Sequence, residues 1–131
     1  MPAKIRTEYT FNVPDKPGQM AKVLELLAKA GVNAIGFCGY GVGGDSATIM
    51  IVGDNEAKTE KALAAAGYSA TRTEVVAVTG PSGKGAGAKI AGKLEKKGIN
   101  LQYIYATTSG AGTSTVVLKV ADAKGALAAL K

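Results

Sequence analysis

The chain of 131 residues contains no histidine and no tryptophan, and its single cysteine is Cys38. Without histidine, the sequence lacks the usual general base, the Cys/His nucleophile pair and the Cys/His ligand sets of zinc sites. One cysteine cannot form an intramolecular disulfide, and Cys38 has no basic neighbour in the sequence. We therefore expect a protein that is not an enzyme and has no metal and no cofactor, with Cys38 as a packed or interface residue.

Long hydrophobic runs are also missing, because glycine and charged residues interrupt every apolar stretch well before the roughly 18 residues that a membrane-spanning helix needs. The first residues, MPAKIRTEYTF, carry charges where a signal peptide needs an apolar segment. We expect a cytoplasmic protein without a membrane partner.

Acidic residues are scarce in the second half of the chain, and the formal net charge of +6 arises there. A helix through this region would carry its lysines as one stripe without interleaved aromatic residues. That pattern is typical of a solvated helix face, so a nucleic-acid partner is not our main expectation. The lysines are Lys84, Lys89, Lys93, Lys96 and Lys97.

An internal repeat is the most informative feature that is present. The octapeptide AGVNAIGF, residues 30–37, is similar to KGINLQYI, residues 97–104, which lies 67 residues later. The same offset keeps prolines, glycines, asparagines and apolar positions in register over about forty residues. The matched pairs include Pro14 with Pro81, Gly18 with Gly85, Gly31 with Gly98, Asn33 with Asn100, and Thr48 with Thr115. The chain therefore contains two copies of one unit.

In the first copy, residues 5–13 form a β-branched and aromatic run, which predicts a strand, and the prolines and glycine of residues 14–18 predict a loop. Apolar residues with helical spacing from Met20 to Leu27 predict a helix that ends at Gly31. Strands are expected over residues 32–40 and 46–52, joined by a loop at residues 41–45. A second helix, N-capped by Asp54, is expected to end near Gly67, with a fourth strand over residues 68–73.

The second copy predicts the same order: a strand over residues 74–79, a helix over 86–97, a hairpin of strands 99–107 and 113–120, and a helix capped by Asp122. A βαββαβ unit of about 65 residues is the ferredoxin-like arrangement, in which the helices cover one face of an antiparallel sheet. We predict an α+β protein with two such repeats, residues 1–73 and 74–131. The second repeat ends without its last strand, so another segment or another chain would have to complete its sheet.

Two glycine-rich motifs could suggest nucleotide binding. Gly39, Gly41 and Gly44 match GxGxxG, but a strand follows them where a dinucleotide site needs a helix. The loop GPSGKG, residues 80–85, lies between a strand and a helix, yet its spacing differs from that of a P-loop. Its backbone N–H groups and Lys84 could still attract an anion.

The segment VPDKPGQM, residues 13–20, carries the most specific chemistry. Its prolines rigidify the loop, Gly18 allows a ligand to approach the backbone, and the N–H groups at the helix start suit a carboxylate or phosphate. Asp15 could accept a ligand ammonium group, so that one loop would hold both ends of a zwitterion. A capped turn that binds nothing explains the same residues.

The segment VPDKPGQMAKVLELLAKAGVNAIGF, residues 13–37, resembles the opening of an ACT domain, with its D-x-P-G loop, amphipathic helix and G-[IV]-N before the second strand. Residues 73–106 resemble the same domain less closely, because Ser82 and Lys84 replace the Asp and the Pro of that motif. The whole chain is similar to short stand-alone tandem ACT proteins. The resemblance implies two ACT-type folds that bind an amino acid or related metabolite.

Carried over from the resemblance, the ligand contacts of the first repeat would fall on one loop and on the start of the second strand. A possible second site would fall on the corresponding residues of the second repeat. The first set is Asp15, Lys16, Pro17, Gly18, Gln19, Met20, Asn33, Ala34 and Ile35; the second set is Ser82, Gly83, Lys84, Gly85 and Asn100.

The sequence thus predicts a non-catalytic regulatory protein that senses an amino acid at an interface between domains or subunits. Small domains with exposed sheet edges gain from pairing, so a homodimer is expected. The alternative is a protein-interaction module in which the ligand site is vestigial and the lysine-rich second repeat docks an acidic partner or nucleic acid.

Overall fold

The computed structural model describes residues 2–107 and 112–131. Residue 1, in the first predicted domain, and residues 108–111, in the predicted hairpin of the second domain, lie outside the described residues. Each repeat has the predicted order of strand, helix, two strands and helix. The elements are β1 (Ala3–Pro14), α1 (Gln19–Lys29), β2 (Ala34–Gly43), β3 (Ser46–Gly53), α2 (Glu56–Ala65), β4 (Thr71–Pro81), α3 (Ala86–Lys96), β5 (Tyr103–Thr107), β6 (Thr113–Lys119) and α4 (Ala123–Ala129).

The chain forms two compact units. The N-terminal unit is Thr7–Thr73, and the C-terminal unit combines Met1–Arg6 with Glu74–Lys131. Strands β1 and β4 therefore each contribute residues to both units. The strand order is β2-β3-β1-β4 in the N-terminal unit and β1-β4-β6-β5 in the C-terminal unit.

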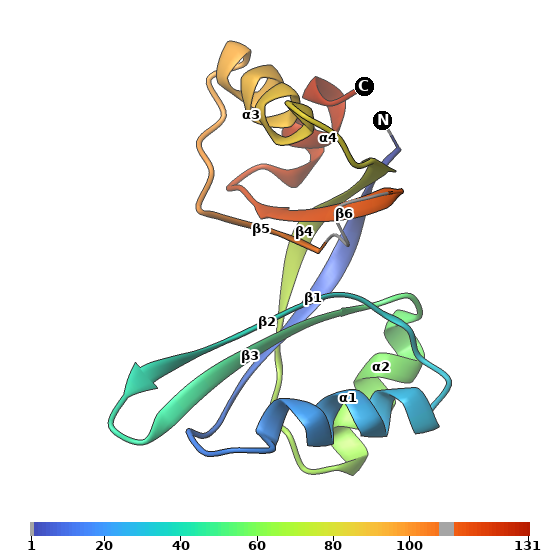
Figure 1. Cartoon of the computed structure of the whole chain (residues 1–131), viewed down its shortest axis with the longest axis vertical. Helices are drawn as coiled ribbons and strands as arrows, with labels where there is room; N and C mark the ends of the chain where they lie inside the picture. The colour runs from blue at the N-terminus through green and yellow to red at the C-terminus, as the bar shows by residue number, and fades with distance from the viewer. Residues whose placement is uncertain (1, 108–111) are drawn as a thin grey trace. The chain divides into compact units, whose positions relative to one another are not determined.

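In the N-terminal unit, α1 and α2 cover one face of the sheet (Figure 1). Strand β3 pairs antiparallel with β1 and with β2, which places Phe11 opposite Ile49. Because side chains alternate along a strand, Phe11 and Ile49 both face the helices. There they pack with Val23 and Leu27 of α1, whose spacing is that of the predicted helix.

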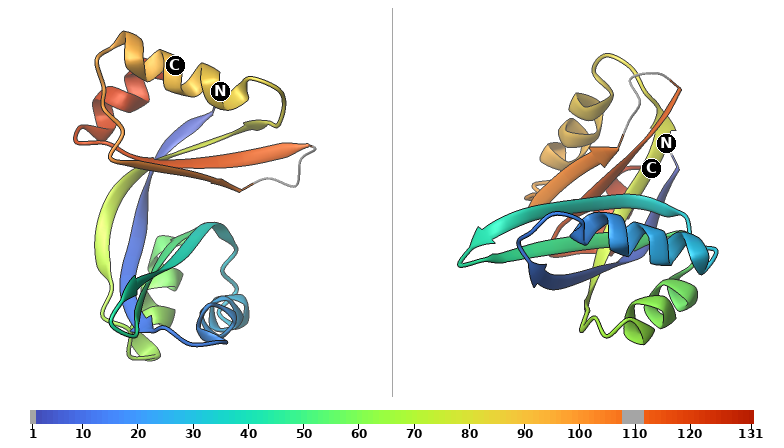
Figure 2. Two further views of the ribbon diagram at one scale, coloured as in Figure 1. Left: turned by 60° about the vertical axis from the view of Figure 1, so that its left-hand side comes forward. Right: turned by 60° about the horizontal axis from the view of Figure 1, so that its bottom comes forward.

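In the C-terminal unit, α3 and α4 cover one face of the sheet (Figure 2). Strand β6 pairs antiparallel with β4 and with β5. The core contains Val78 of β4, Leu118 of β6, and Ile90 and Leu94 of α3. The fold is therefore the predicted α+β arrangement, with two βαββαβ units and helices on one face of each antiparallel sheet.

The N-terminal end of β1 supplies the strand that the second repeat lacks. The Thr79 N–H donates to Pro2 O at 3.0 Å. Ala3 and Ile5 are half-buried and pack against the core of the C-terminal unit. A segment more than 60 residues earlier in the sequence thus occupies the last strand position of this sheet.

The strand boundaries differ from the prediction in three places. Residues 68–73 and 74–79 were predicted as two strands, but β4 is one continuous strand, Thr71–Pro81. Strand β2 runs through Gly43, so that the predicted hairpin loop of residues 41–45 shortens to a turn at Gly44 and Asp45. Strand β5 begins only at Tyr103, because the preceding residues close the end of α3: the Ile99 N–H donates to Leu94 O at 3.0 Å.

One predicted helix cap is wrong and one is confirmed. The N-cap of α2 is Asn55 and not the predicted Asp54. The Asn55 side chain accepts a hydrogen bond from the Lys58 N–H at 2.9 Å. Asp54 instead accepts a hydrogen bond from the Asn33 N–H at 3.0 Å through its carboxylate and so ties the start of β2 to the end of β3. Asp122 caps α4 by accepting from the Gly125 N–H at 3.0 Å.

Tyr9 of β1 is buried, and its environment shifts the pKa of its hydroxyl. Its hydroxyl donates to Glu56 O at 3.2 Å and lies 3.5 Å from a carboxylate oxygen of Glu60, which forms an ion pair with Arg72. Burial raises the pKa of the Tyr9 hydroxyl, the charge of Arg72 lowers it, and Glu56 raises it further. The net effect is a raised pKa, which favours the neutral phenol in the folded protein.

Candidate ligand-binding site

Backbone hydrogen bonds and a left-handed glycine shape the loop between β1 and α1. The Asp15 N–H donates to Asp45 O at 2.9 Å, and the Lys16 N–H donates to Pro14 O at 3.0 Å. Gly18, directly before α1, has a φ of 91°, a conformation that glycine adopts without strain. The first N–H groups of an α-helix have no intrahelical partner, and Gly18 has no side chain that could cap those of α1. The loop therefore offers hydrogen-bond donors and a partial positive charge.

A cavity of about 450 Å³ lies beside this loop, within the size range of small-molecule sites. It lies entirely within the N-terminal unit and is bounded by the loop, the first turn of α1, and strands β2 and β3. Its lining residues are Val13, Pro14, Asp15, Lys16, Gln19, Met20, Phe37, Cys38, Gly39, Tyr40, Gly41, Ala47, Thr48 and Ile49.

Two glycines of β2 create room for side chains from the loop and from α1. Gly39 and Gly41 pair with Ile49 and Ala47 of β3, so they lie on the helix-covered face of the sheet. A Cβ atom on Gly39 would lie 2.9 Å from Met20 Cε, and one on Gly41 would lie 2.8 Å from Asp15 Oδ2. A side chain at either position would therefore force the end of the Met20 or Asp15 side chain to move.

Four of the nine residues predicted for the first site line this cavity: Asp15, Lys16, Gln19 and Met20. Pro17 and Gly18 shape the loop but do not line the cavity. Asn33, Ala34 and Ile35 lie at the other end of β2 and are not lining residues. The backbone of Asn33 is held by Asp54, since the Asp54 N–H also donates to Asn33 O at 2.9 Å. The structure therefore brings together the loop residues and not these three.

Strands β2 and β3 form a side of the cavity that was not predicted from the sequence. Phe37, Gly39 and Gly41 belong to it, together with Ala47 and Ile49. Alternating glycines at positions 39, 41 and 43 were the available signal, because a glycine on every second residue of a strand leaves one face bare. The GxGxxG match instead groups Gly39 and Gly41 with Gly44, which does not continue this alternation.

A corresponding cavity of about 190 Å³ lies in the C-terminal unit. Ser82 and Gly87 line it at the positions that Asp15 and Met20 occupy in the first repeat, 67 residues earlier. Of the predicted second-site residues, Ser82 and Gly83 line this cavity, whereas Lys84, Gly85 and Asn100 do not. Among the residues that the structure describes, the lining of the smaller cavity therefore has no carboxylate, lysine or thioether, whereas the larger cavity has all three.

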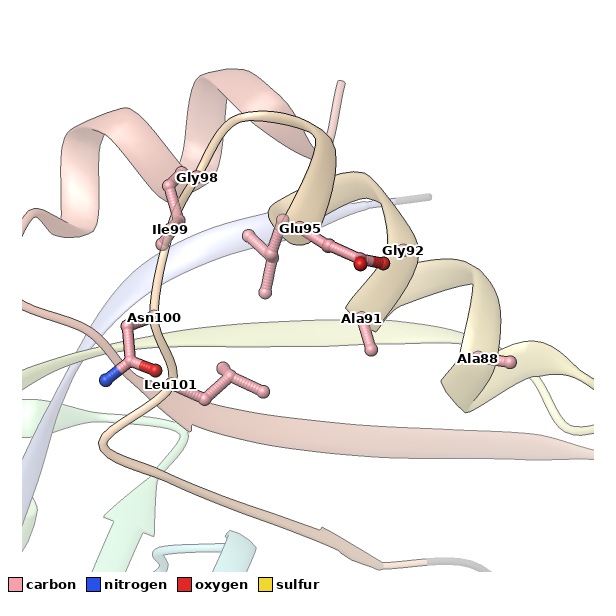
Figure 3. A pocket seen from close by; sticks show the side chains of 9 residues that line it. Ala88, Ala91, Gly92, Glu95, Gly98, Ile99, Asn100 and Leu101 are labelled. Carbon is pink, nitrogen blue, oxygen red and sulfur yellow. The ribbon is translucent and has the colours of Figure 1, made fainter.

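Asn100 lines a different feature, an open groove of about 670 Å³ along α3 (Figure 3). Small residues of α3, Ala88, Ala91 and Gly92, form one side of this groove, and residues 98–101 form the other. Within the described part of the chain, Glu95 is the charged residue of its lining. The groove is larger than either cavity, but it brings few polar groups together.

The described residues contain no group of three or more His, Cys, Asp or Glu side chains that could hold a metal ion. Over residues 2–107 and 112–131, no helix has both the length and the apolar character needed to cross a membrane. The possible chemistry of the larger cavity thus rests on one carboxylate, one lysine, backbone N–H groups and an apolar surface, together with the side chains of Gln19, Cys38, Tyr40 and Thr48.

No protein-family model matches the chain, and no curated protein matches it. Its structure is similar over nearly the whole length to that of protein BT0572 from Bacteroides thetaiotaomicron, with a TM-score of 0.80 and 24% sequence identity, covering 98% of this chain and 88% of that chain. It is also similar to the ligand-free regulatory subunit of aspartate kinase from Thermus thermophilus, with a TM-score of 0.66 and 21% identity over 98% of this chain and 93% of that chain. The fold is that of this regulatory subunit.

The regulatory subunit of aspartate kinase from Thermus flavus has the same fold, with a TM-score of 0.58 and 22% identity over 98% of this chain and 93% of that chain. Both regulatory subunits are of nearly the same extent as this chain. The two units therefore have the tandem ACT-type fold that the sequence resemblance implied.

Proposed function

We propose that the protein is a regulatory module, not an enzyme, and that it binds a free amino acid or a related small metabolite in the cavity of the N-terminal unit. The ligand would favour one arrangement of domains or subunits over another, by an amount limited to its difference in affinity for the two arrangements. The fold, which this chain shares with regulatory subunits of aspartate kinase, supports the regulatory role.

The observation that carries the proposal is the combination of opposite charges and free backbone donors at one cavity. Asp15 is a hydrogen-bond acceptor for an ammonium group. Lys16 and the first N–H groups of α1 are donors for a carboxylate. An α-amino acid carries these two groups on one carbon atom, so the loop can hold it by both ends.

Isothermal titration calorimetry with the twenty amino acids tests this proposal. At least one amino acid should bind, and Asp15→Ala should weaken its binding about tenfold or more, since a hydrogen bond to a charged group contributes about 1.5–3 kcal/mol. Ser82→Ala is the matched control, because Ser82 holds the same position in the smaller cavity. If no amino acid binds, or if both variants behave like the wild type, the proposed site is wrong.

We also propose that the protein forms a homodimer through β2. This strand lies at the edge of its sheet and exposes apolar side chains, with Phe37 40%, Tyr40 50% and Val42 54% exposed. An unpaired strand with exposed apolar residues is a template for pairing with a second chain. Sedimentation velocity should show a dimer that Val42→Lys dissociates; a monomeric wild type at tens of micromolar would contradict this.

A second candidate function is a docking module for an acidic protein or a nucleic acid. Lys89, Lys93 and Lys96 lie on α3 at helical spacing, and Glu95 is the acidic residue of that helix. Binding through such lysines would weaken steeply as salt increases, whereas a desolvated amino-acid site would respond weakly. Titration with heparin at two salt concentrations separates the two functions.

A further inference from the structure

The side chains that line the cavity of the N-terminal unit divide into a polar group, formed by the loop and by Gln19 at the start of α1, and an apolar surface. Asp15 and Lys16 come from the loop and are exposed. The strands and α1 contribute Val13 and Ile49, which are only 5% and 3% exposed, and the half-buried Met20. A ligand whose charged end is held by the loop would therefore direct the rest of its structure toward apolar side chains.

The polar side chain that β3 adds to the lining is not available to a ligand. The Thr48 hydroxyl donates to Asn12 Oδ1 at 3.0 Å. Thr48 also alternates with Ala47 and Ile49 along β3, which places its side chain on the opposite face of the sheet. The helix-covered face of the cavity thus presents the apolar side chains of Val13, Met20, Phe37, Ala47 and Ile49 and the bare backbone of two glycines, and Gln19, the first residue of α1, adds a polar side chain next to the loop.

Resting on the proposed function, we infer that the ligand is an amino acid with an apolar side chain, such as valine, leucine, isoleucine or methionine. A charged or amide side chain placed against Val13, Met20 and Ile49 would lose its hydration without gaining a hydrogen-bond partner, which is costly. An apolar side chain gains from the same burial.

Met20 is the residue of this surface that can adjust to the shape of the ligand. Its Cε atom reaches the space above Gly39, 2.9 Å from where a Cβ atom would lie. Its flexible thioether packs against apolar groups of different shape. The position corresponding to Met20 in the smaller cavity is Gly87, so only the larger cavity has this adjustable wall.

Pairs of amino acids with the same shape separate polarity from size. We compare valine with threonine and leucine with asparagine by calorimetric titration of the wild-type protein. Valine should bind about 10- to 100-fold more tightly than threonine, which is the range over which an apolar pocket discriminates against an added hydroxyl group. Leucine should bind more tightly than asparagine by at least the same factor.

Met20→Gln is the variant that tests the assignment, because glutamine is similar in length and is also a good helix former. It should lower the preference for leucine over asparagine about tenfold while the protein still binds amino acids through Asp15. Gly87→Gln is the matched control: it places the same side chain in the smaller cavity, where a Cβ atom meets no atom within 4 Å. It should leave the preference unchanged.

The possible outcomes distinguish this inference from the proposed function. If no amino acid binds, the proposed function and this inference fail together. If amino acids bind but threonine or asparagine matches its apolar partner, the inference is wrong and the proposed function stands. If Gly87→Gln, and not Met20→Gln, changes the preference, the ligand occupies the C-terminal unit and the inference is also wrong.

Discussion

Removal of residues 2–5 should loosen the C-terminal unit and leave the N-terminal unit intact. These residues belong to the strand position that completes the sheet beside β4. The deletion removes the half-buried side chains of Ala3 and Ile5 from the core of that unit, and it removes the acceptor of the Thr79 N–H. The deletion retains Arg6 and the part of β1 from Thr7 onward, and that part belongs to the N-terminal unit.

The expected size of the effect follows from these contacts. Full burial of an isoleucine side chain contributes about 1.5–3 kcal/mol, so half-buried Ile5 contributes about 1 kcal/mol. The hydrogen bond from Thr79 to Pro2 adds about 0.5–1.5 kcal/mol. Together with Ala3, the loss is about 2–3 kcal/mol for the opening of the C-terminal unit, which corresponds to about 30- to 150-fold faster exchange of its protected amides.

Hydrogen–deuterium exchange with peptide resolution measures each unit separately. Peptides from α3 and β6 should exchange faster after the deletion, while peptides from α1 and β3 keep the wild-type rates. Lys4→Ala provides the control, because Lys4 is exposed and its replacement retains the backbone of the strand. Unchanged exchange in α3 and β6, or equal acceleration in both units, would refute the assignment of this segment to the C-terminal unit.

Three further substitutions test the energetics of single groups. The raised pKa of Tyr9 stabilises the fold below pH 10 and this contribution is lost as the pH rises through the folded-state pKa. Above pH 10, the unfolding free energy of the wild type should therefore fall more steeply with pH than that of Tyr9→Phe. Parallel pH profiles would contradict the raised pKa. The Tyr68 hydroxyl is buried without a hydrogen-bond partner among the described residues, and its ring contacts Phe11 at 4.7 Å between centroids. Tyr68→Phe should leave the unfolding free energy unchanged or raise it by about 1 kcal/mol, and a loss in urea denaturation would show that the hydroxyl has a partner. Gly92→Ala in α3, where a Cβ atom meets nothing within 4 Å, should raise that free energy by about 0.5–1 kcal/mol, and a loss would mean that the site is more crowded than the structure has it.

Most of the fold could be predicted because the two copies share the glycines at their turns as well as the pattern of apolar residues. The pairs Gly18 with Gly85 and Gly31 with Gly98 all have positive φ angles, so the equivalent positions begin and end equivalent helices. Local signals of this kind determine local elements. They predicted α1, α3 and the hairpin of β2 and β3 within a few residues.

The sequence could not predict that residues 3–6 join the C-terminal unit. Alternation along a strand shows which face of the strand is apolar, but it does not show which strands will be its neighbours. Residues 5–13 were therefore read as one strand of the first repeat, although residues 3–6 belong to the C-terminal unit. The cap of α2 shows a similar limit, since Asp54 and Asn55 are both good N-cap residues and only the backbone decides between them.

The candidate site was predicted where one short segment carries the chemistry and missed where pairing between strands brings residues together. Asp15, Lys16, Gln19 and Met20 are close in sequence, and their role follows from the loop itself. Phe37 and Ile49 join them only because β2 and β3 pair in a particular register. Register depends on the hairpin turn, which the sequence placed too early.

The placement of residues 3–6 has a consequence for synthesis on the ribosome. The N-terminal unit is complete in sequence at Thr73, so it can fold while the rest of the chain is still being made. Residues 3–6 are synthesised before every other strand of their own sheet, and β4 and β6 follow much later. Until then Ala3 and Ile5 have no core to join, and closing the long connection to them costs entropy. The C-terminal unit should therefore form after the N-terminal unit, when residues 3–6 take their place beside β4, a strand that is synthesised much later.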